Sequence, residues 1–249
     1  MPSVDLNCDV GEGVGADVEL MPLVTSANIA CGFHAGDAAT MRATVALALE
    51  HGVALGAHPS FRDVAGFGRR NIELPTEEVQ DLVTQQVHAL ADVAAAQGAR
   101  LTHVKPHGAL YNMASTRRDL AEAIARAVYL VDPALVLFGL AGSALVSAGR
   151  EAGLSVAEEV FADRRYAPDG TLVSRSLPRA LITDTHESIE QTLQMVRHGT
   201  VRAVNGADVP VRADTICLHG DAAGAANVAR ALRSALESNG VTVRAPWAT

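Results

Sequence analysis

Short hydrophobic runs alternate with longer amphipathic stretches along the whole chain. The short runs predict strands at Val4–Cys8, Ser26–Cys31, Val53–Ala57, Leu101–Lys105, Leu135–Gly139, Leu154–Val160, Thr215–Leu218 and, more briefly, Val241–Val243. The longer stretches carry apolar residues at helical spacing. They predict helices from Asp37 to about His51, Pro75 to Gly98, Ser115 or Thr116 to about Leu130, Gly142 to Ala152, Asp184 to His198 and Asp221 to Ser238.

The alternation of strands and helices predicts parallel pairing, because a crossover helix connects each strand to the next. The chain has 249 residues, a length that suits one barrel. We therefore expect an α/β fold, a single (β/α) barrel of seven or eight strands that occupies residues 1–249 as one domain. An open doubly wound sheet is the alternative, but no Gly-x-Gly-x-x-Gly motif opens the first helix and no Walker-type loop occurs.

Two segments are too long for simple connections, residues 59–74 and residues 161–183. Long loops in a compact domain usually carry function. Both follow predicted strands, so we expect both to lie over the same end of the barrel.

Composition narrows the function. The net charge is −8 and basic residues form no run, which argues against nucleic-acid binding. No apolar stretch approaches the ~20 residues of a membrane helix, and no leader is visible at the N-terminus. The three cysteines, Cys8, Cys31 and Cys217, lie in strand-like runs and are expected to be reduced, buried thiols. These features predict a cytoplasmic protein that acts on a small molecule.

Polar clusters stand where the predicted strands end, at residues 5–12, 28–37, 56–59, 105–108 and 217–221. Active sites of parallel α/β folds lie at the carboxyl ends of the strands. Asp5, Asn7 and Asp9 alternate along one strand, so their side chains should share its inner face. Asp9 and Glu12 come just past the strand, where a base or a metal ligand would stand.

Imidazole and ammonium groups follow the next strands. His34 and His58 end successive strands, and with Asp9 they could bind a divalent metal; alternatively, they could hydrogen-bond a substrate or phosphate. Lys105 suits an anionic substrate, and His107 suits proton transfer near neutral pH. We expect both to lie at the mouth of the barrel and outside its core.

Further candidates lie in loops. The backbone after His219, at the start of the last predicted helix, could hold an anion, with Asp221 instead serving as the helix cap. Five loop arginines could clamp a carboxylate or phosphate: Arg69, Arg70, Arg164, Arg165 and Arg175. Five further histidines, placed on helices or in mid-element, receive no function: His51, His88, His103, His186 and His198.

Taken together, the clusters resemble the LamB/YcsF family from residue 3 to about residue 245. The matching strings are Asp5-Leu-Asn-Cys-Asp-Val-Gly-Glu12, Asn28-Ile-Ala-Cys-Gly-Phe-His-Ala-Gly-Asp37, Gly56-Ala-His-Pro59, Val104-Lys-Pro-His-Gly-Ala-Leu-Tyr111, Glu159-Val-Phe-Ala-Asp-Arg-Arg-Tyr166 and Cys217-Leu-His-Gly-Asp221. The resemblance implies a barrel related to the glycoside hydrolase/deacetylase superfamily. It also implies ATP-dependent hydrolysis of 5-oxo-L-proline to L-glutamate by a 5-oxoprolinase in which this chain works beside separate B and C subunits.

The implied reaction needs a base for water, cations for phosphate and carboxylate, and an acid for the ring nitrogen. Asp9 or Glu12 is the candidate base, Lys105 would neutralise negative charge, and His107 is the candidate acid. The predicted substrate-binding residues are Asn7, Asn28, His34, His58, Arg69, Tyr111, Arg164 and His219. ATP would be a co-substrate, and its site could lie in the partner subunits.

Two alternatives and several properties stay open. The chain could be a metal-dependent deacetylase or glycosidase, with Asp9, His34 and His58 as ligands, or a non-catalytic ligand-binding barrel. The presence of the metal and the oligomeric state, including a homo-oligomer, stay open as well.

Overall fold

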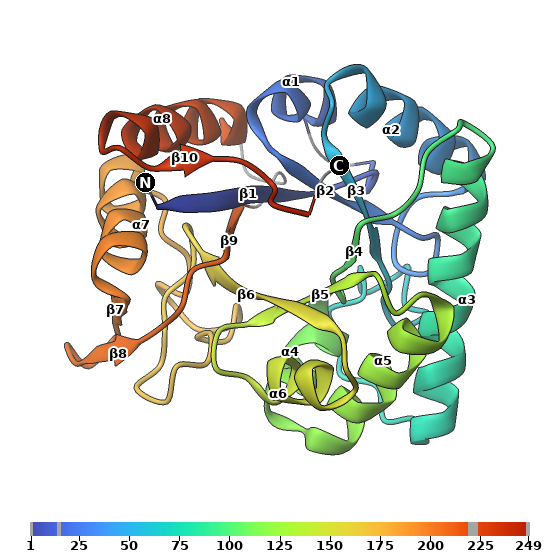
Figure 1. The fold of residues 1–249 in the computed structure, drawn as a ribbon. Helices are drawn as coiled ribbons and strands as arrows, with labels where there is room; N and C mark the ends of the chain where they lie inside the picture. The colour runs from blue at the N-terminus through green and yellow to red at the C-terminus, as the bar shows by residue number, and fades with distance from the viewer. Residues whose placement is uncertain (1, 14–15, 219–223, 248–249) are drawn as a thin grey trace.

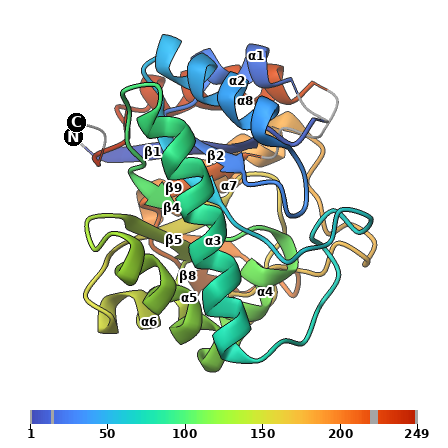
Figure 2. The same cartoon turned by 90° about the vertical axis from the view of Figure 1, so that its right-hand side faces the viewer.

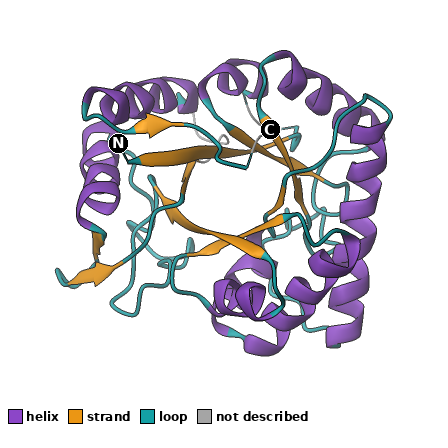
Figure 3. Cartoon of the chain, in the orientation of Figure 1, coloured by secondary structure: helices purple, strands orange, loops and turns teal. Residues whose placement is uncertain are grey.

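The computed structural model describes residues 2–13, 16–218 and 224–247. Within these residues, seven parallel strands close into a barrel. They are β1 (Ser3–Val10), β2 (Ser26–Ala30), β3 (Ala54–His58), β4 (His103–Val104), β5 (Val136–Leu140), β6 (Ser155–Phe161) and β9 (Thr215–Leu218). The barrel closes where β9 pairs with β1, and β10 (Thr242–Val243) adds to the start of β1. The predicted fold class is therefore confirmed, with strands inside a ring of helices (Figures 1 and 3).

The helices cover the outside of the barrel (Figure 1). They are α1 (Asp17–Leu20), the 3-10 turn η1 (Met21–Leu23), α2 (Ala38–Glu50), α3 (Thr76–Ala95), α4 (Gly108–Thr116), α5 (Arg118–Val131), α6 (Ala144–Glu151), α7 (Thr185–His198) and α8 (Ala225–Ser238). Asp37 caps α2 as predicted, because its carboxylate accepts a hydrogen bond of 2.7 Å from the backbone N–H of Thr40. Asp184 caps α7 in the same way.

Several elements differ from the prediction, and among them the short α1 and η1 were not predicted. The segment after β4 is already helical from Gly108, so the helix expected to begin at Ser115 or Thr116 is instead the second of two, α4 and α5. An antiparallel hairpin, β7 (Thr200–Arg202) with β8 (Asp208–Pro210), lies outside the barrel sheet and was not predicted. Its strands are short and mostly exposed, so they lack a clear alternating pattern. The predicted start of the last helix at Asp221 lies outside the described residues.

The two faces of the strands carry different chemistry. On β1, Leu6, Cys8 and Val10 face the helices and join the main hydrophobic core. The alternate positions Asp5 and Asn7 are fully buried inside the barrel. A polar interior of this kind is stable only if its groups are hydrogen-bonded to one another.

The two ends of the barrel are also different. At the amino end, the Trp247 ring packs against Phe138 with centroids 4.9 Å apart, and its Nε1 donates to Ser26 Oγ. The loops over residues 59–74 and 161–183 lie on the opposite side from the termini (Figure 2). Their residues line the cavity at the carboxyl ends of the strands, as expected. Among the described residues, no helix is long and apolar enough to cross a membrane.

Candidate active site

A stack of polar side chains rises along the inner face of β1. At its base, Asp5 accepts hydrogen bonds from Thr25 at 2.6 Å, Ser26 at 2.8 Å and Thr215 at 2.5 Å. Burial raises the pKa of Asp5 to about 6, although these hydroxyl donors oppose the shift. The side chains that bind its carboxylate are hydroxyl groups.

Next along the strand, two asparagine side chains form hydrogen bonds across the barrel interior. The amide nitrogen of Asn28 donates to Asn7 Oδ1 at 2.8 Å and to Asp9 Oδ1 at 2.9 Å. The amide nitrogen of Asn7 donates to Glu159 Oε1 at 2.9 Å and to Thr215 Oγ1 at 2.7 Å. Both asparagines are fully buried and neither lines the cavity. Their amides therefore hold the carboxylates of Asp9 and Glu159 in place.

His103 fixes the orientation of Asn28. Its Nε2 lies 2.9 Å from Asn28 Oδ1, an atom that can only accept, so Nε2 carries the proton. Its Nδ1 then accepts from the Thr102 hydroxyl at 2.9 Å. Burial lowers the pKa of His103 to about 3, helped by the charge of Lys105, so the ring stays neutral. The sequence assigned no function to this histidine.

Lys105 occupies the centre of the stack. Its Nζ lies 3.0 Å from Asp9 Oδ1, 2.9 Å from Glu159 Oε1, 3.2 Å from Asn7 Oδ1 and 3.1 Å from Cys217 Sγ. Burial by itself would lower the pKa of Lys105, but the charges of Asp9 and Glu159 outweigh it and hold that pKa well above its usual range. The residue is 2% exposed, so the expectation that it lies outside the core is wrong.

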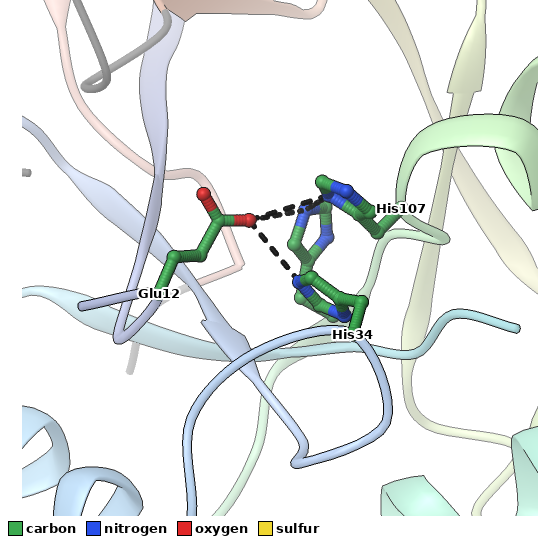
Figure 4. A group of neighbouring side chains, drawn as sticks. Glu12, His34 and His107 are labelled. Atoms are coloured by element: carbon green, nitrogen blue, oxygen red, sulfur yellow. Dashed lines mark hydrogen bonds and ion pairs between the residues drawn. The ribbon is translucent and has the colours of Figure 1, made fainter. Parts of the chain in front are cut away.

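Beside the ammonium group, four side chains converge: Glu12, His34, His58 and His107. One carboxylate oxygen of Glu12, Oε1, lies 3.1 Å from His34 Nε2 and 3.3 Å from His107 Nδ1 (Figure 4). His58 Nε2 lies 2.9 Å from His107 Nδ1 and 4.0 Å from the same Glu12 oxygen. All three histidines are buried, so His107 also lies inside and not outside the core.

Backbone carbonyls set the tautomers of two of these rings. His58 Nδ1 lies 2.7 Å from the carbonyl oxygen of Lys105, and His107 Nε2 lies 2.9 Å from that of Phe67. A carbonyl only accepts, so each of these nitrogens carries the ring proton. His58 Nε2 and His107 Nδ1 are then both lone pairs, and they face each other across 2.9 Å. Such an arrangement repels unless a proton or a cation lies between the atoms.

Two of the histidines are held neutral by their surroundings. Burial lowers the pKa of His34, and the hydrogen bond with Glu12 only partly offsets it. Burial and the neighbouring His58 and His34 hold the pKa of His107 well below its usual range. Neutral imidazole is the form that binds metals.

The geometry of this group fits a metal ion. One donor atom from each of Glu12, His34, His58 and His107 lies within 4.8 Å of the others, a spacing that a single ion could bridge after small adjustments. This set differs from the predicted ligands, since Glu12 and His107 join the two predicted histidines in place of Asp9. Asp9 Oδ2 lies 3.3 Å from His58 Nε2, at the edge of the group.

A cavity of about 660 Å³ opens above these residues. Its lining includes Asp9, Glu12, Lys105 and His107 from the cluster, together with Tyr111, Arg69 and Arg164. Burial, reinforced by the charge of Glu159, holds the pKa of the Tyr111 hydroxyl well above its usual range. The predicted residue His219 lies outside the described part of the chain.

The turn after β4 places His107 against the loop of residues 59–74. Gly108 has a φ of +58°, and a Cβ there would lie 2.4 Å from the carbonyl oxygen of Gly68. Only glycine combines this backbone conformation with so close an approach. The turn at Gly108 therefore brings the Phe67 carbonyl onto the His107 ring.

Sequence reasoning missed Glu159, His103 and Cys217 as parts of the site. Glu159 and Cys217 did lie in the motifs that carried the family resemblance, and that was the available signal. His103 lies within β4, before the polar residues that follow the strand, and a histidine in mid-element is usually structural.

The protein is a parallel α/β barrel. It carries a buried cluster of acidic, lysine and histidine side chains at the carboxyl ends of its strands. The chain belongs to the LamB/YcsF family, whose sequence profile matches residues 4–249. It is 57% identical over 250 residues to the A subunit of 5-oxoprolinase from Shouchella clausii, covering 98% of this chain and 99% of that protein.

Solved structures agree with the fold. The lactam utilization protein from Thermus thermophilus is 49% identical with a TM-score of 0.91, covering 98% of this chain and 99% of that chain. A structure described as T48 deacetylase with substrate is 16% identical with a TM-score of 0.51, covering 97% of this chain and 87% of that chain. That second likeness concerns the fold alone.

Proposed function

We propose that this chain is the A subunit of an ATP-dependent 5-oxoprolinase that opens the ring of 5-oxo-L-proline to give L-glutamate. The proposal rests on family membership and on relatives named as 5-oxoprolinase A subunits or as a lactam utilization protein. The observation that carries the chemistry is the convergence of Asp9, Glu12, Lys105, His58 and His107 on one cavity, with His34 beside them in the same cluster. Hydrolysis of an unreactive cyclic amide requires such a set of polar groups in one place.

Partner subunits would supply the activation. No Walker-type loop occurs in this sequence, so B and C subunits would bind ATP and phosphorylate the ring amide oxygen. Water would then add to the activated ring carbon, and the carbon–nitrogen bond would break as the nitrogen takes a proton. A second water would hydrolyse the resulting acyl phosphate to the carboxylate and inorganic phosphate.

The geometry supports a division of roles. Asp9 is the base, because Lys105 and Asn28 hold its Oδ1 while the carboxylate lines the cavity. Lys105 is a fixed positive charge beside that carboxylate, and its own hydrogens are already used by protein partners. Asn7 and Asn28 act through the groups they orient and not by touching substrate.

Glu12, His34, His58 and His107 would hold a divalent cation. The carboxylate of Glu12 contacts two of these histidines, and Asp9 lies at the edge of the group, so a divalent ion here would have negative charge beside it. When bound, such an ion polarises a carbonyl or phosphoryl oxygen and stabilises negative charge. With His107 held neutral and turned towards this group, the proton for the ring nitrogen would come from Asp9 after it has taken one from water.

The test is an assay of glutamate release from 5-oxoproline and ATP, with the chain alone, the partner subunits alone and the complete set. We expect turnover only with the complete set. The chain alone reaching ~1 s⁻¹, an ordinary enzymatic rate, would contradict the division of labour.

A metal-dependent hydrolase of the deacetylase type is the second candidate, and the Glu12–histidine group favours it. It predicts amide or ester hydrolysis without ATP, lost to chelators and restored by added metal. Ligand binding without turnover under any of these conditions would instead indicate a binding barrel.

Three further properties belong to the same proposal. Residues 1–249 form one domain, since the barrel closes between strands from opposite ends of the sequence. The protein is cytoplasmic, because its three buried cysteines are unbridged and suit a reducing compartment. It assembles with B and C subunits, and a homo-oligomer within that assembly would be visible by light scattering.

A further inference from the structure

The cavity is lined by one buried guanidinium, that of Arg164, whose hydrogen-bond donors are incompletely satisfied. Arg164 lines the cavity and is only 4% exposed. One of its terminal nitrogens donates to the carbonyl oxygen of Val173 at 2.7 Å. Its Nε is buried and has no hydrogen-bond partner among the described residues. A buried donor without an acceptor is costly, and a buried cation more so, so a ligand acceptor would stabilise this wall.

A second guanidinium reinforces the first. Arg175 also lines the cavity and lies close enough for its charge to act on Arg164. Burial lowers the pKa of Arg164 to about 10, Arg175 acts in the same direction, and Asp163 only partly offsets them. Arg164 is buried and Arg175 is half-buried, and two neighbouring cations favour an anion with two charges over one with a single charge.

Hydroxyl groups line the same cavity as the two arginines. Ser174 and Ser176 line the cavity with their hydroxyl oxygens 2.9 Å apart, and Thr171 lines the same wall. Asp169, an acid on this rim, has its carboxylate turned to the Thr171 hydroxyl and backbone N–H. The wall therefore presents several donors to one region, which suits the three outer oxygens of a phosphoryl group better than the two oxygens of a carboxylate.

The cavity is also larger than the proposed substrate. A volume of about 660 Å³ is that of a pocket for a drug-sized ligand, whereas 5-oxoproline is a five-membered ring with one carboxylate. The catalytic floor and the arginine wall belong to the same cavity, so a second group on the same ligand can reach the wall.

We infer that Arg164 and Arg175, with Ser174 and Ser176, form a subsite for a phosphoryl group. The inference rests on the proposed function and deepens it, since the ligand would be the phosphorylated lactam or the phosphate released from it.

The test measures binding of inorganic phosphate to the isolated chain by calorimetry, at constant ionic strength and without ATP or partners. Acetate is the monoanion control. We expect Arg164→Gln and Arg175→Gln each to weaken phosphate binding about tenfold or more. Arg179→Gln, at an exposed arginine of the same loop that does not line the cavity, should leave it unchanged.

Thermal melting distinguishes a lost subsite from a lost fold. If Arg164→Gln melts early, Arg164→Lys and Arg175→Gln replace it, and retained phosphate affinity in both overturns the inference. Acetate binding as tightly as phosphate, or an equal loss in Arg179→Gln, also overturns it. Because no turnover is measured, phosphate binding can succeed where the 5-oxoprolinase assay fails, and the reverse.

Discussion

The Nε2 of His58 and the Nδ1 of His107 lie 2.9 Å apart with their lone pairs facing each other. The carbonyl oxygens of Lys105 and Phe67 hold the ring protons on the far sides. Oriented lone pairs fixed by backbone acceptors are typical of metal-binding histidines. The repulsion in this contact disappears when a cation enters.

Divalent-metal binding is the first prediction. Titration of metal-free protein with Zn²⁺, followed by calorimetry and by elemental analysis after dialysis, should give one tightly bound ion per chain. Glu12→Gln and His34→Asn should each weaken Zn²⁺ binding about 10²-fold, because each removes one metal-ligand atom. His186→Asn, at an exposed histidine on α7, is the control. Equal binding by all four proteins would rule out this site.

The second prediction concerns the buried lysine. Lys105→Met leaves Asp9 and Glu159 without their cation, so the free energy of unfolding should fall by about 3–5 kcal/mol. Turnover of the complete complex should fall on the order of 10²-fold or more, since a charge beside the reacting groups is lost. Urea unfolding and the glutamate assay measure the two effects.

The matched control is Arg118→Gln, which breaks exposed pairs with Glu122 and Glu151 and should change the free energy of unfolding far less than Lys105→Met does. In the double variant Lys105→Met with Glu159→Gln, the loss should be smaller than the sum of the single losses. Additive losses would show that the two side chains do not interact.

The third prediction is a pH dependence that belongs to His103. Its pKa is about 3 in the folded protein against 6.5 when unfolded, so the unfolded chain binds an extra proton between these values. Stability from this group is therefore complete above pH 6.5 and is lost as the pH falls towards 3. Asp5, with its pKa raised from 3.8 to about 6, acts in the opposite direction between those two values.

Replacing His103 isolates its contribution. His103→Leu should be less stable than the wild type at neutral pH, because Asn28 Oδ1 loses its donor, at a cost of about 1–3 kcal/mol. As the pH falls from neutral to mildly acidic, its stability should fall less steeply than that of the wild type. Parallel curves from urea unfolding at several pH values would refute the assignment.

The fourth prediction concerns the thiols. Burial raises the pKa of Cys31 to about 12 and holds those of Cys8 and Cys217 well above their usual range. Native protein at mildly alkaline pH should therefore react with a thiol reagent only as fast as it unfolds. Protein unfolded in guanidinium should react with three equivalents of the reagent, one for each cysteine. Rapid native labelling of Cys217 would mean that Lys105 holds it as a thiolate.

The strands and the residues at their ends could be predicted from the sequence because both depend on local patterns. Asp9, Glu12, His34, His58, Lys105 and His107 each follow a hydrophobic run, and parallel strands bring such positions to one end. Contacts across the barrel join residues far apart in the sequence, so no local sequence pattern indicates them. Glu159 meets Lys105, and His103 meets Asn28, only because the sheet closes.

The helix at Gly108–Thr116 was missed for a related reason. Its apolar residues are buried, so they form a helix by tertiary packing and without a side-chain cap at the start. The burial of Lys105 could not be predicted either, since a lysine is usually exposed unless paired. Its two carboxylate partners come from strands far away in the sequence.

The pairing of β9 with β1 has a consequence for synthesis on the ribosome. Asp5 and Asn7 are among the first residues made, yet both bond to Thr215, which is 210 and 208 positions later in a chain of 249. A growing chain can pair Asp5 with Thr25 and Ser26 early, but both Asp5 and Asn7 lack their partner Thr215 until translation is almost complete. A product that terminates before β9 would lack the strand that pairs with both β1 and β6 and closes the barrel. Such an open barrel would be degraded by cellular proteases.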